Sequence, residues 1–209
     1  MVGCQAELEG AMGRDTRELF LDTAEELFAE RGFYGVSIAA IADELDLTKQ
    51  ALLHHFGSKE KLYGEVLARI SVEFEAMIKK AAADPGDPVR QLTTFFMQLQ
   101  SPENWRLRRT QLLIRELLDN RRRAEKAGAW YLKPFLESLI VMVQSVPNWE
   151  KASDAEALAI AYQWLGAINY FAISGPTLSG IFGKKRLEEL TNVHTLMLER
   201  QIILTLKAR

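Results

Sequence analysis

The sequence predicts an all-α fold, and three observations support this. Apolar residues recur at helical spacing along almost all of the 209 residues, and no run alternates apolar and polar residues as a half-buried strand does. The 13 Gly and 6 Pro fall between the periodic segments. Hydrophobic residues make up 48% of the chain and charged residues 26%, which is typical of globular domains and too apolar for a disordered chain. The length suits one or two domains.

The first expected helix covers residues 15–31. Its apolar stripe, spaced i, i+4, i+7 and i+8, consists of Phe20, Ala24, Leu27 and Phe28. Gly32 suits the position that follows the last turn of a helix. Residues 1–14 are expected to form a mobile tail. They also lack the apolar core of a secretory signal, so we do not expect them to direct secretion.

Two short helices follow the first one. Ser37 is the expected N-cap of a helix that ends at Leu45, and Thr48 is the expected N-cap of a helix that ends at Phe56. Ser58 then begins a long helix. Two short helices that are joined by a tight turn and braced by a longer helix have the pattern of a helix-turn-helix, whose second helix enters the major groove of DNA.

The second short helix presents one apolar face and one polar face. Its apolar residues are expected to pack on the stripe of the first helix, which leaves the other face exposed. Thr, Lys and Gln can hydrogen-bond to base edges or phosphates, and an exposed Leu can contact a thymine methyl group. The residues on this exposed face are Thr48, Lys49, Gln50, Leu53 and His54. The alternative interpretation is a helical hairpin that only packs.

Beyond a turn cluster at residues 84–88, the sequence predicts five more helices. Their expected ranges are 88–100, 103–119, 123–146, 154–174 and 186–207, and Gly175-Pro176 is one of the expected breaks between them. The chain therefore divides into a helix-turn-helix domain over residues 15–62 and a helical domain over residues 63–209.

Residues 28–60 carry many residue types at fixed spacings. These residues are Phe28, Gly32, Phe33, Gly35, Ser37, Ile41-Ala42, Leu47-Thr48, Leu52, His55-Phe56 and Ser58-Lys59-Glu60. The series resembles the N-terminal domain of the TetR family of transcriptional regulators. The resemblance implies a homodimeric repressor that reads a near-palindromic operator in double-stranded DNA. It also implies that a small molecule bound in the helical C-terminal domain releases the operator. Activation in place of repression stays open.

The resemblance also implies roles for individual residues. Lys49, Gln50 and Ala51 would approach bases. Ser37, Thr48, His54 and His55 would contact the phosphate backbone or support the recognition helix. Lys59 would meet a phosphate at the N-terminus of the next helix.

Three features depart from the family pattern. Ala39 and Ala40 give the first short helix little with which to contact bases or phosphates. Leu53 stands where the family often has Tyr, which removes one hydroxyl. Asp46 stands where the family often has Gly, and Asp tolerates the left-handed backbone conformation better than most residues. We therefore expect the turn to keep its shape.

The charge of the first domain is unusual for a DNA-binding domain. Residues 1–60 contain five basic residues and twelve acidic ones, whereas a nucleic-acid-binding domain usually carries a basic surface. We expect few phosphate contacts and a shallow dependence of binding on salt. The expected contact face carries Arg14, Arg17, Lys49, Lys59 and Lys61.

The helix expected at residues 154–174 is apolar on nearly every side, and the last helix is similar. Such a helix must face its own core and a second surface as well. We expect the two helices to form a dimer interface, since two-fold reading of DNA requires a dimer. The alternative is a central core helix in a monomer.

Aromatic and polar residues gather in the second domain. An apolar pocket with a few polar groups is typical of a small-molecule site. The candidate lining residues are Trp105, Arg109, Trp130, Tyr131, Phe135, Gln163, Trp164 and Asn169. The alternatives are ordinary core packing for the aromatic residues, backbone hydrogen bonds for Gln163 and Asn169, and a solvated surface for the arginines at 106–123.

Other functional classes lack support in the sequence. It has no glycine-rich nucleotide loop, no zinc-binding His pair and no nucleophile elbow, so we expect neither an enzyme nor a metal or other cofactor. A single cysteine excludes a disulfide framework, and no apolar run is long enough to span a membrane. We expect a cytoplasmic protein. The alternative function is a helical protein-interaction module without specific DNA binding.

Overall fold

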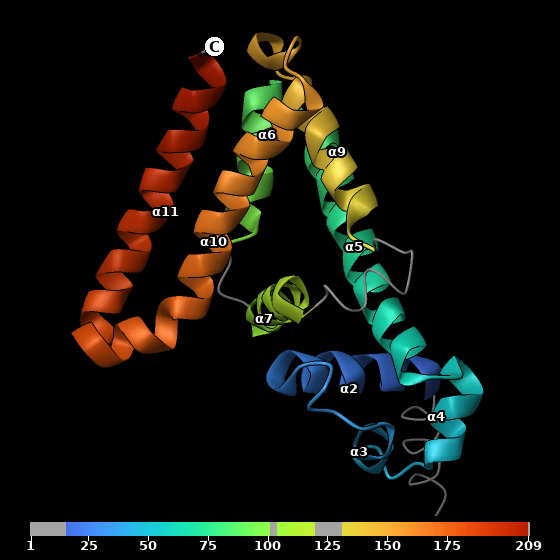
Figure 1. Cartoon of the computed structure of the whole chain (residues 1–209). Helices are drawn as coiled ribbons and strands as arrows, with labels where there is room; N and C mark the ends of the chain where they lie inside the picture. The colour runs from blue at the N-terminus through green and yellow to red at the C-terminus, as the bar shows by residue number, and fades with distance from the viewer. Residues whose placement is uncertain (1–15, 101–103, 120–130, 209) are drawn as a thin grey trace, which may run out of the picture. The chain divides into compact units, whose positions relative to one another are not determined.

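A computed structural model of the chain describes residues 16–100, 104–119 and 131–208 (Figure 1). Within these ranges the regular structure consists of helices and contains no strand, so the all-α prediction is confirmed. The chain divides into two compact units, one up to Ala68 and one from Arg69 onward. None of the helices in the described ranges is both long enough and apolar enough to cross a membrane.

The first unit contains α2 (Thr16–Arg31), α3 (Ile38–Asp43), α4 (Lys49–Phe56) and the first turns of α5 (Lys59–Ala83). The helices α2, α3 and α4 pack against one another. Their contact surfaces are apolar side chains that are less than 5% exposed, and these residues are Phe20, Phe28, Ile41, Leu52 and Phe56. The expected helix-turn-helix and its bracing helix are therefore present.

The connection between α2 and α3 is fixed by a close backbone approach at Gly35. A Cβ atom at this position would lie 2.2 Å from the carbonyl oxygen of Arg31. Because a backbone oxygen cannot move aside as the end of a flexible side chain can, this turn requires Gly. The glycine thus lets the chain turn back directly after the last residue of α2.

The second unit contains the rest of α5 and the remaining helices. They are α6 (Pro88–Gln98), α7 (Asn104–Asp119), α9 (Lys133–Gln144), the short 3-10 helix η1 (Pro147–Trp149), α10 (Asp154–Phe182) and α11 (Lys184–Lys207). The helix α10 packs against α7, α9 and α11, and α6 packs against α9 and α11. The core of this unit includes Phe95, Phe96, Leu112, Leu139 and Ile202, which are not exposed.

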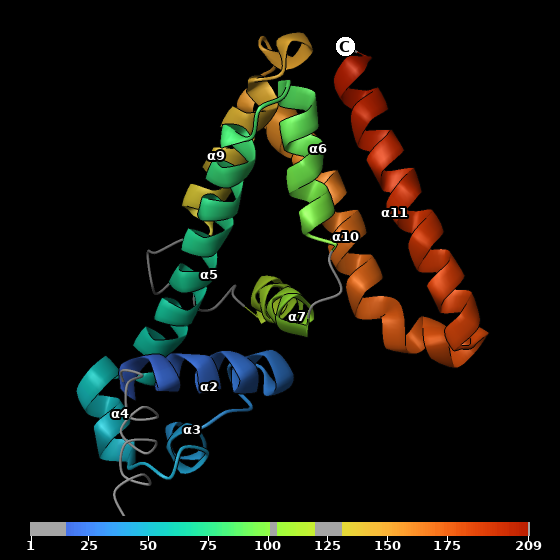
Figure 2. The ribbon, with the colours of Figure 1, turned by 180° about the vertical axis from the view of Figure 1, so that it is seen from behind.

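Two expected helices differ in extent from those in the structure. The expected break at Gly175-Pro176 does not occur, because α10 continues to Phe182 and ends at Gly183, whose φ is +82°. Pro176 removes one backbone hydrogen bond inside the helix, and the last turns of α10 bend away from its main axis (Figures 1 and 2). The single helix expected over residues 123–146 is not continuous, because residues 131–132 form a turn and α9 begins at Lys133. Its expected start at residue 123 lies outside the described residues. Pro134 lies in the first turn of α9, where the missing N–H costs nothing.

The core of the first unit yields a prediction about stability. Leu52→Ala should lower the free energy of unfolding by about 2–5 kcal/mol, because it removes a side chain that is not exposed and leaves a cavity between α2 and α4. Urea denaturation followed by circular dichroism measures this change. The matched control is Leu53→Ala on the same helix, where the side chain is only half-buried and a loss below about 1 kcal/mol is expected. Equal losses in the two variants would contradict this packing.

Candidate nucleic-acid interface and ligand pocket

The helix α4 is anchored by its apolar face and presents polar side chains outward. Leu52 and Phe56 are buried, whereas Lys49 and Gln50 at its N-terminal end and His54 at its C-terminal end are exposed. Ala51 and Leu53 are half-buried between these two sets. The structure therefore brings the expected base-reading residues together on the outer surface of one short helix.

Hydroxyl side chains cap both short helices, as the sequence predicted. Thr48 has extended backbone angles, and its Oγ1 accepts a hydrogen bond of 3.2 Å from the backbone N–H of Ala51. The Oγ of Ser37 accepts a hydrogen bond of 3.0 Å from the backbone N–H of Ala40. Both caps are exposed, so each hydroxyl group can donate its own hydrogen to an outside acceptor.

The turn between α3 and α4 keeps its shape with Asp46 in the left-handed region. Its φ is +54°, and it is the one residue other than glycine with a positive φ in the described ranges. The N–H of Leu47 donates a hydrogen bond of 3.0 Å to the carbonyl oxygen of Ala42. The expectation that Asp tolerates this conformation is confirmed.

His55 supports the recognition helix through ring packing. Its side chain is exposed, but its ring lies 5.9 Å from the ring of Phe20 and 5.8 Å from that of His54. His55 thus lies between His54 on the exposed face of α4 and the buried Phe20 of α2.

The structure assigns Lys59 an internal role that the sequence did not suggest. Its Nζ donates hydrogen bonds of 2.9 Å to the carbonyl oxygens of Phe33 and of Val36, and it lies 4.3 Å from the centre of the Phe33 ring. The ammonium group therefore ties the start of α5 to the connection between α2 and α3. These contacts are internal to the first unit, and the phosphate contact expected for Lys59 stays a prediction.

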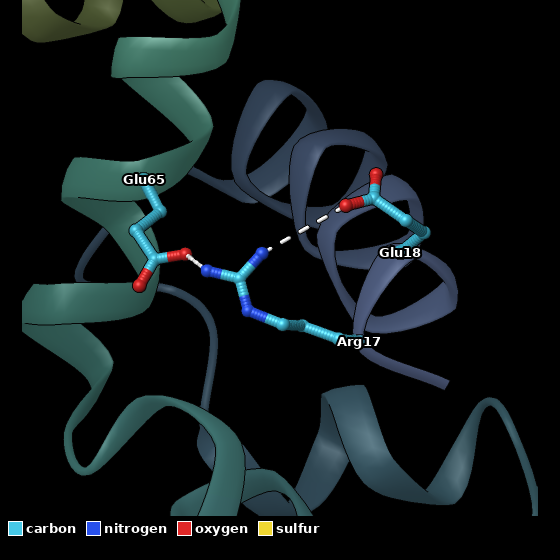
Figure 3. Close-up of polar contacts among 3 residues, drawn as sticks. All are labelled: Arg17, Glu18 and Glu65. Atoms are coloured by element: carbon cyan, nitrogen blue, oxygen red, sulfur yellow. Dashed lines mark hydrogen bonds and ion pairs between the residues drawn. The ribbon is translucent and has the colours of Figure 1, made fainter. Parts of the chain in front are cut away.

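Arg17 also contacts the interior of the first unit. Its guanidinium group pairs with Glu65 of α5 and approaches Glu18 at 3.8 Å (Figure 3). It also lies 5.1 Å from the centre of the Phe56 ring. Of the five basic residues expected on the contact face, Arg14 lies outside the described residues. Lys49 and Lys61 are exposed, so they are the stronger candidates for phosphate contacts.

An apolar pocket opens in the second unit among α5, α7, α9 and α10. Its cavity volume is about 110 Å³, and further space lies open to solvent at its mouth. Most of the lining is apolar and consists of Phe74, Leu99, Leu113, Leu117, Leu132, Phe135, Leu136, Leu165 and Gly166. The polar lining residues are Arg109, Thr110, Tyr162 and Asn169. An apolar lining with a few polar groups is typical of small-molecule sites.

Three of the eight candidate ligand-binding residues line this pocket, namely Arg109, Phe135 and Asn169. Trp164 is instead part of the core, where its ring lies 5.0 Å from that of Phe96 in an edge-to-face arrangement. Gln163 is exposed, and neither Gln163 nor Tyr131 belongs to the lining.

The other two candidates cannot be assigned to the pocket. The side chain of Trp105 and all of Trp130 lie outside the described residues. The sequence analysis missed the leucine lining, whose signal is the apolar stripe that continues from Arg109 to Leu113 and Leu117 at i, i+4 and i+8.

A pair of hydrogen bonds joins Arg109 to α5. Its Nη2 donates a hydrogen bond of 3.1 Å to Oε1 of Glu73, and its Nη1 pairs with Oε2. The Arg109 side chain is 11% exposed and that of Glu73 is 44% exposed. The pair therefore joins a buried cation to a carboxylate that still meets solvent.

The helices α10 and α11 expose apolar side chains that no described residue covers. Tyr170 is 73% exposed, Leu196 65% and Met197 67%. The opposite face of α10 is buried through Trp164 and Ile168. The expected second surface of this helix is therefore present, and it is uncovered in the single chain.

His194 lies between these two helices. Its ring stacks on that of Phe171 with a centroid distance of 4.0 Å and an angle of 8° between the planes. Burial lowers the pKa of His194 below its usual value. The neutral form of the side chain therefore predominates at neutral pH, as suits a packing residue.

Comparison with known proteins agrees with the geometry of the first unit. Residues 20–66 match the family model described as bacterial regulatory proteins, tetR family. The chain is 35% identical over 83 residues to the HTH-type transcriptional repressor NicS of Pseudomonas putida, and this match covers 38% of the chain and 39% of NicS. It is 41% identical over 61 residues to the repressor KstR2 of Rhodococcus jostii, a match that covers 29% of each sequence. The matched region thus spans well under half the length of these relatives.

Solved structures extend the likeness in fold to most of the chain. A putative fatty acid metabolism regulator from Clostridium perfringens has a TM-score of 0.64 at 12% identity and covers 87% of this chain and 97% of its own. A putative transcriptional regulator from Saccharomonospora viridis, solved with choline, has a TM-score of 0.63 at 20% identity and covers 90% and 95%. Over residues 20–66, the chain is therefore similar to the TetR family of bacterial regulatory proteins.

Proposed function

We propose that the chain is a sequence-specific DNA-binding repressor that acts as a homodimer and releases its operator when a small molecule binds the second unit. The observation that carries the proposal is the outer face of α4, where Lys49, Gln50 and His54 are exposed on a capped helix that α2 holds in place. Relatives of this domain are named transcriptional repressors. The alternative, a helical protein-interaction module, does not explain why these polar residues gather on the outer face of α4.

Two copies of α4 would enter successive major grooves, about 34–36 Å apart along the DNA. The exposed side chains of α10 and α11 supply a surface on which a second copy can pack. The helix α5 is continuous from Lys59, which fixes the α2–α3 connection, to Phe74, which lines the pocket. A ligand that prefers one position of α5 would shift the population of dimers away from the DNA-binding spacing.

The combined variant Lys49→Ala and Gln50→Ala should abolish discrimination between the operator and a scrambled duplex while the dimer stays intact, because base contacts specify sequence. Fluorescence anisotropy on the protein's own upstream DNA, or on duplexes selected from a random pool, measures this discrimination. The matched control is Lys80→Ala, an exposed lysine of α5 in the second unit. Unchanged selectivity in the double variant would show that α4 is not the recognition helix. A wild-type chain that selects no sequence from the pool would favour the interaction module.

Substitutions of Lys59 and Lys61 distinguish a lysine that stabilises the fold from a lysine that contacts DNA. Lys59→Met should lower the stability of the first unit by about 1–3 kcal/mol through the loss of two charged hydrogen bonds, and it should leave the salt dependence of DNA binding unchanged. Lys61→Met should keep stability and should reduce the slope of log K against log salt by about one for each lysine that contacts a phosphate. Thermal melts and anisotropy at several salt concentrations provide both readouts. A reduced salt slope in Lys59→Met, with an unchanged slope in Lys61→Met, would show that Lys59 contacts a phosphate.

Leu196→Glu should convert the dimer into a monomer, because it places a charge within the exposed apolar face of α11. Sedimentation velocity measures the mass in solution. Leu118→Glu is the control, since Leu118 is 77% exposed but lies on α7. A wild-type monomer at micromolar concentration, or loss of the dimer in the control alone, would contradict the proposed interface.

A further inference from the structure

Arg109 is the one charged residue in the described lining of the pocket. Its guanidinium group is almost fully buried, so most of its hydration is already lost. A buried cation is stable only with an anionic partner. In this structure the partner is the carboxylate of Glu73, which pairs through both of its oxygens.

Glu73 differs from its partner in solvent exposure. Its side chain is 44% exposed and does not belong to the pocket lining. The carboxylate can therefore return to water at small cost once another anion pairs with Arg109. An exchange of one carboxylate for another keeps the bidentate geometry that suits a guanidinium group.

The rest of the lining determines what else a ligand must contain. Six leucines and two phenylalanines face the cavity, so a ligand needs an apolar body to replace water there. Thr110, Tyr162 and Asn169 are uncharged polar residues in this lining. No acidic residue in the described lining favours an ammonium group.

We propose that the pocket binds an amphipathic carboxylic acid, whose carboxylate replaces Glu73 on Arg109 and whose apolar body lies against the leucines. The role of such an acid as the effector rests on the proposed function, whereas its binding does not require DNA. The exchange would leave α5 with an unpaired negative charge at Glu73.

A matched series of ten-carbon compounds tests the head group. The full-length protein is loaded with the neutral fluorescent probe N-phenyl-1-naphthylamine, which is then displaced by decanoate, 1-decanol or decyltrimethylammonium below their micelle concentrations. Decanoate should displace the probe at a concentration about tenfold lower than decanol, as a charge-assisted pair with a buried arginine implies. The cation should be the weakest competitor. If the probe does not bind, isothermal titration with each of the three compounds provides the same comparison.

Two variants test the exchange itself. Glu73→Gln removes the competing charge but keeps a hydrogen-bond acceptor for Arg109, so decanoate should bind about tenfold more tightly while decanol is unaffected. Arg109→Gln should abolish the advantage of decanoate over decanol. Glu75→Gln on α5 and Arg115→Gln on α7 are the matched controls, because both lie outside the pocket lining. Thermal melts confirm that each variant folds.

Several outcomes would overturn the proposal. One is equal binding of decanol and decanoate by the wild-type protein, and another is preference for the cation. A decanoate affinity that Glu73→Gln leaves unchanged would show that the carboxylates do not compete. Lack of decanoate binding in the titration would show that the pocket takes another class of molecule. Operator selectivity is measured separately, so a failure here is distinguishable from a failure of the proposed DNA binding.

Discussion

The continuity of α5 is the constraint on which both units depend. Leu62 and Val66 of this helix are not exposed and belong to the first unit, whereas Ile70 and Phe74 are buried within the second. A helix of 25 residues is about 37 Å long, and unbroken backbone hydrogen bonds make it stiff. Each unit thus buries its own stretch of α5 in its core.

The first unit uses part of its positive charge for its own cohesion. Arg17 pairs with Glu65, and Lys59 binds two backbone carbonyl oxygens, so both basic groups stabilise the packing of α5. This use of charge is consistent with the acidic balance of the first 60 residues. A domain with few available cations gains little non-specific affinity from the DNA backbone. In the proposed complex with DNA, discrimination among sequences would then depend on the side chains of α4.

Local signals in the sequence were sufficient to predict the caps and the turn of the candidate DNA interface. The caps at Ser37 and Thr48 and the left-handed turn at Asp46 depend on residues within a few positions, and the structure confirms them. The path of α10 could not be predicted in the same way. Pro176 normally ends a helix, but here the helix bends and continues to Gly183.

The tasks of Lys59 and of the pocket residues were also not predictable from local sequence. The carbonyl oxygens that hold Lys59 lie more than twenty positions earlier in the chain. Likewise, a leucine that lines a cavity and a leucine that fills a core have the same spacing along a helix. Trp164 and Phe135 illustrate this limit, since both were candidates and only Phe135 lines the pocket.

Gly166 has a consequence for how the selectivity of this pocket can change during evolution. It lies inside α10 and lines the pocket, and a Cβ atom built on it meets no other atom within 4 Å. Glycine inside a helix costs about 1 kcal/mol relative to alanine. A larger residue here would therefore strengthen the helix and narrow the cavity in a single mutational step. If the pocket binds a ligand as proposed, a substitution at this position would change the shape of the site and stabilise the helix together.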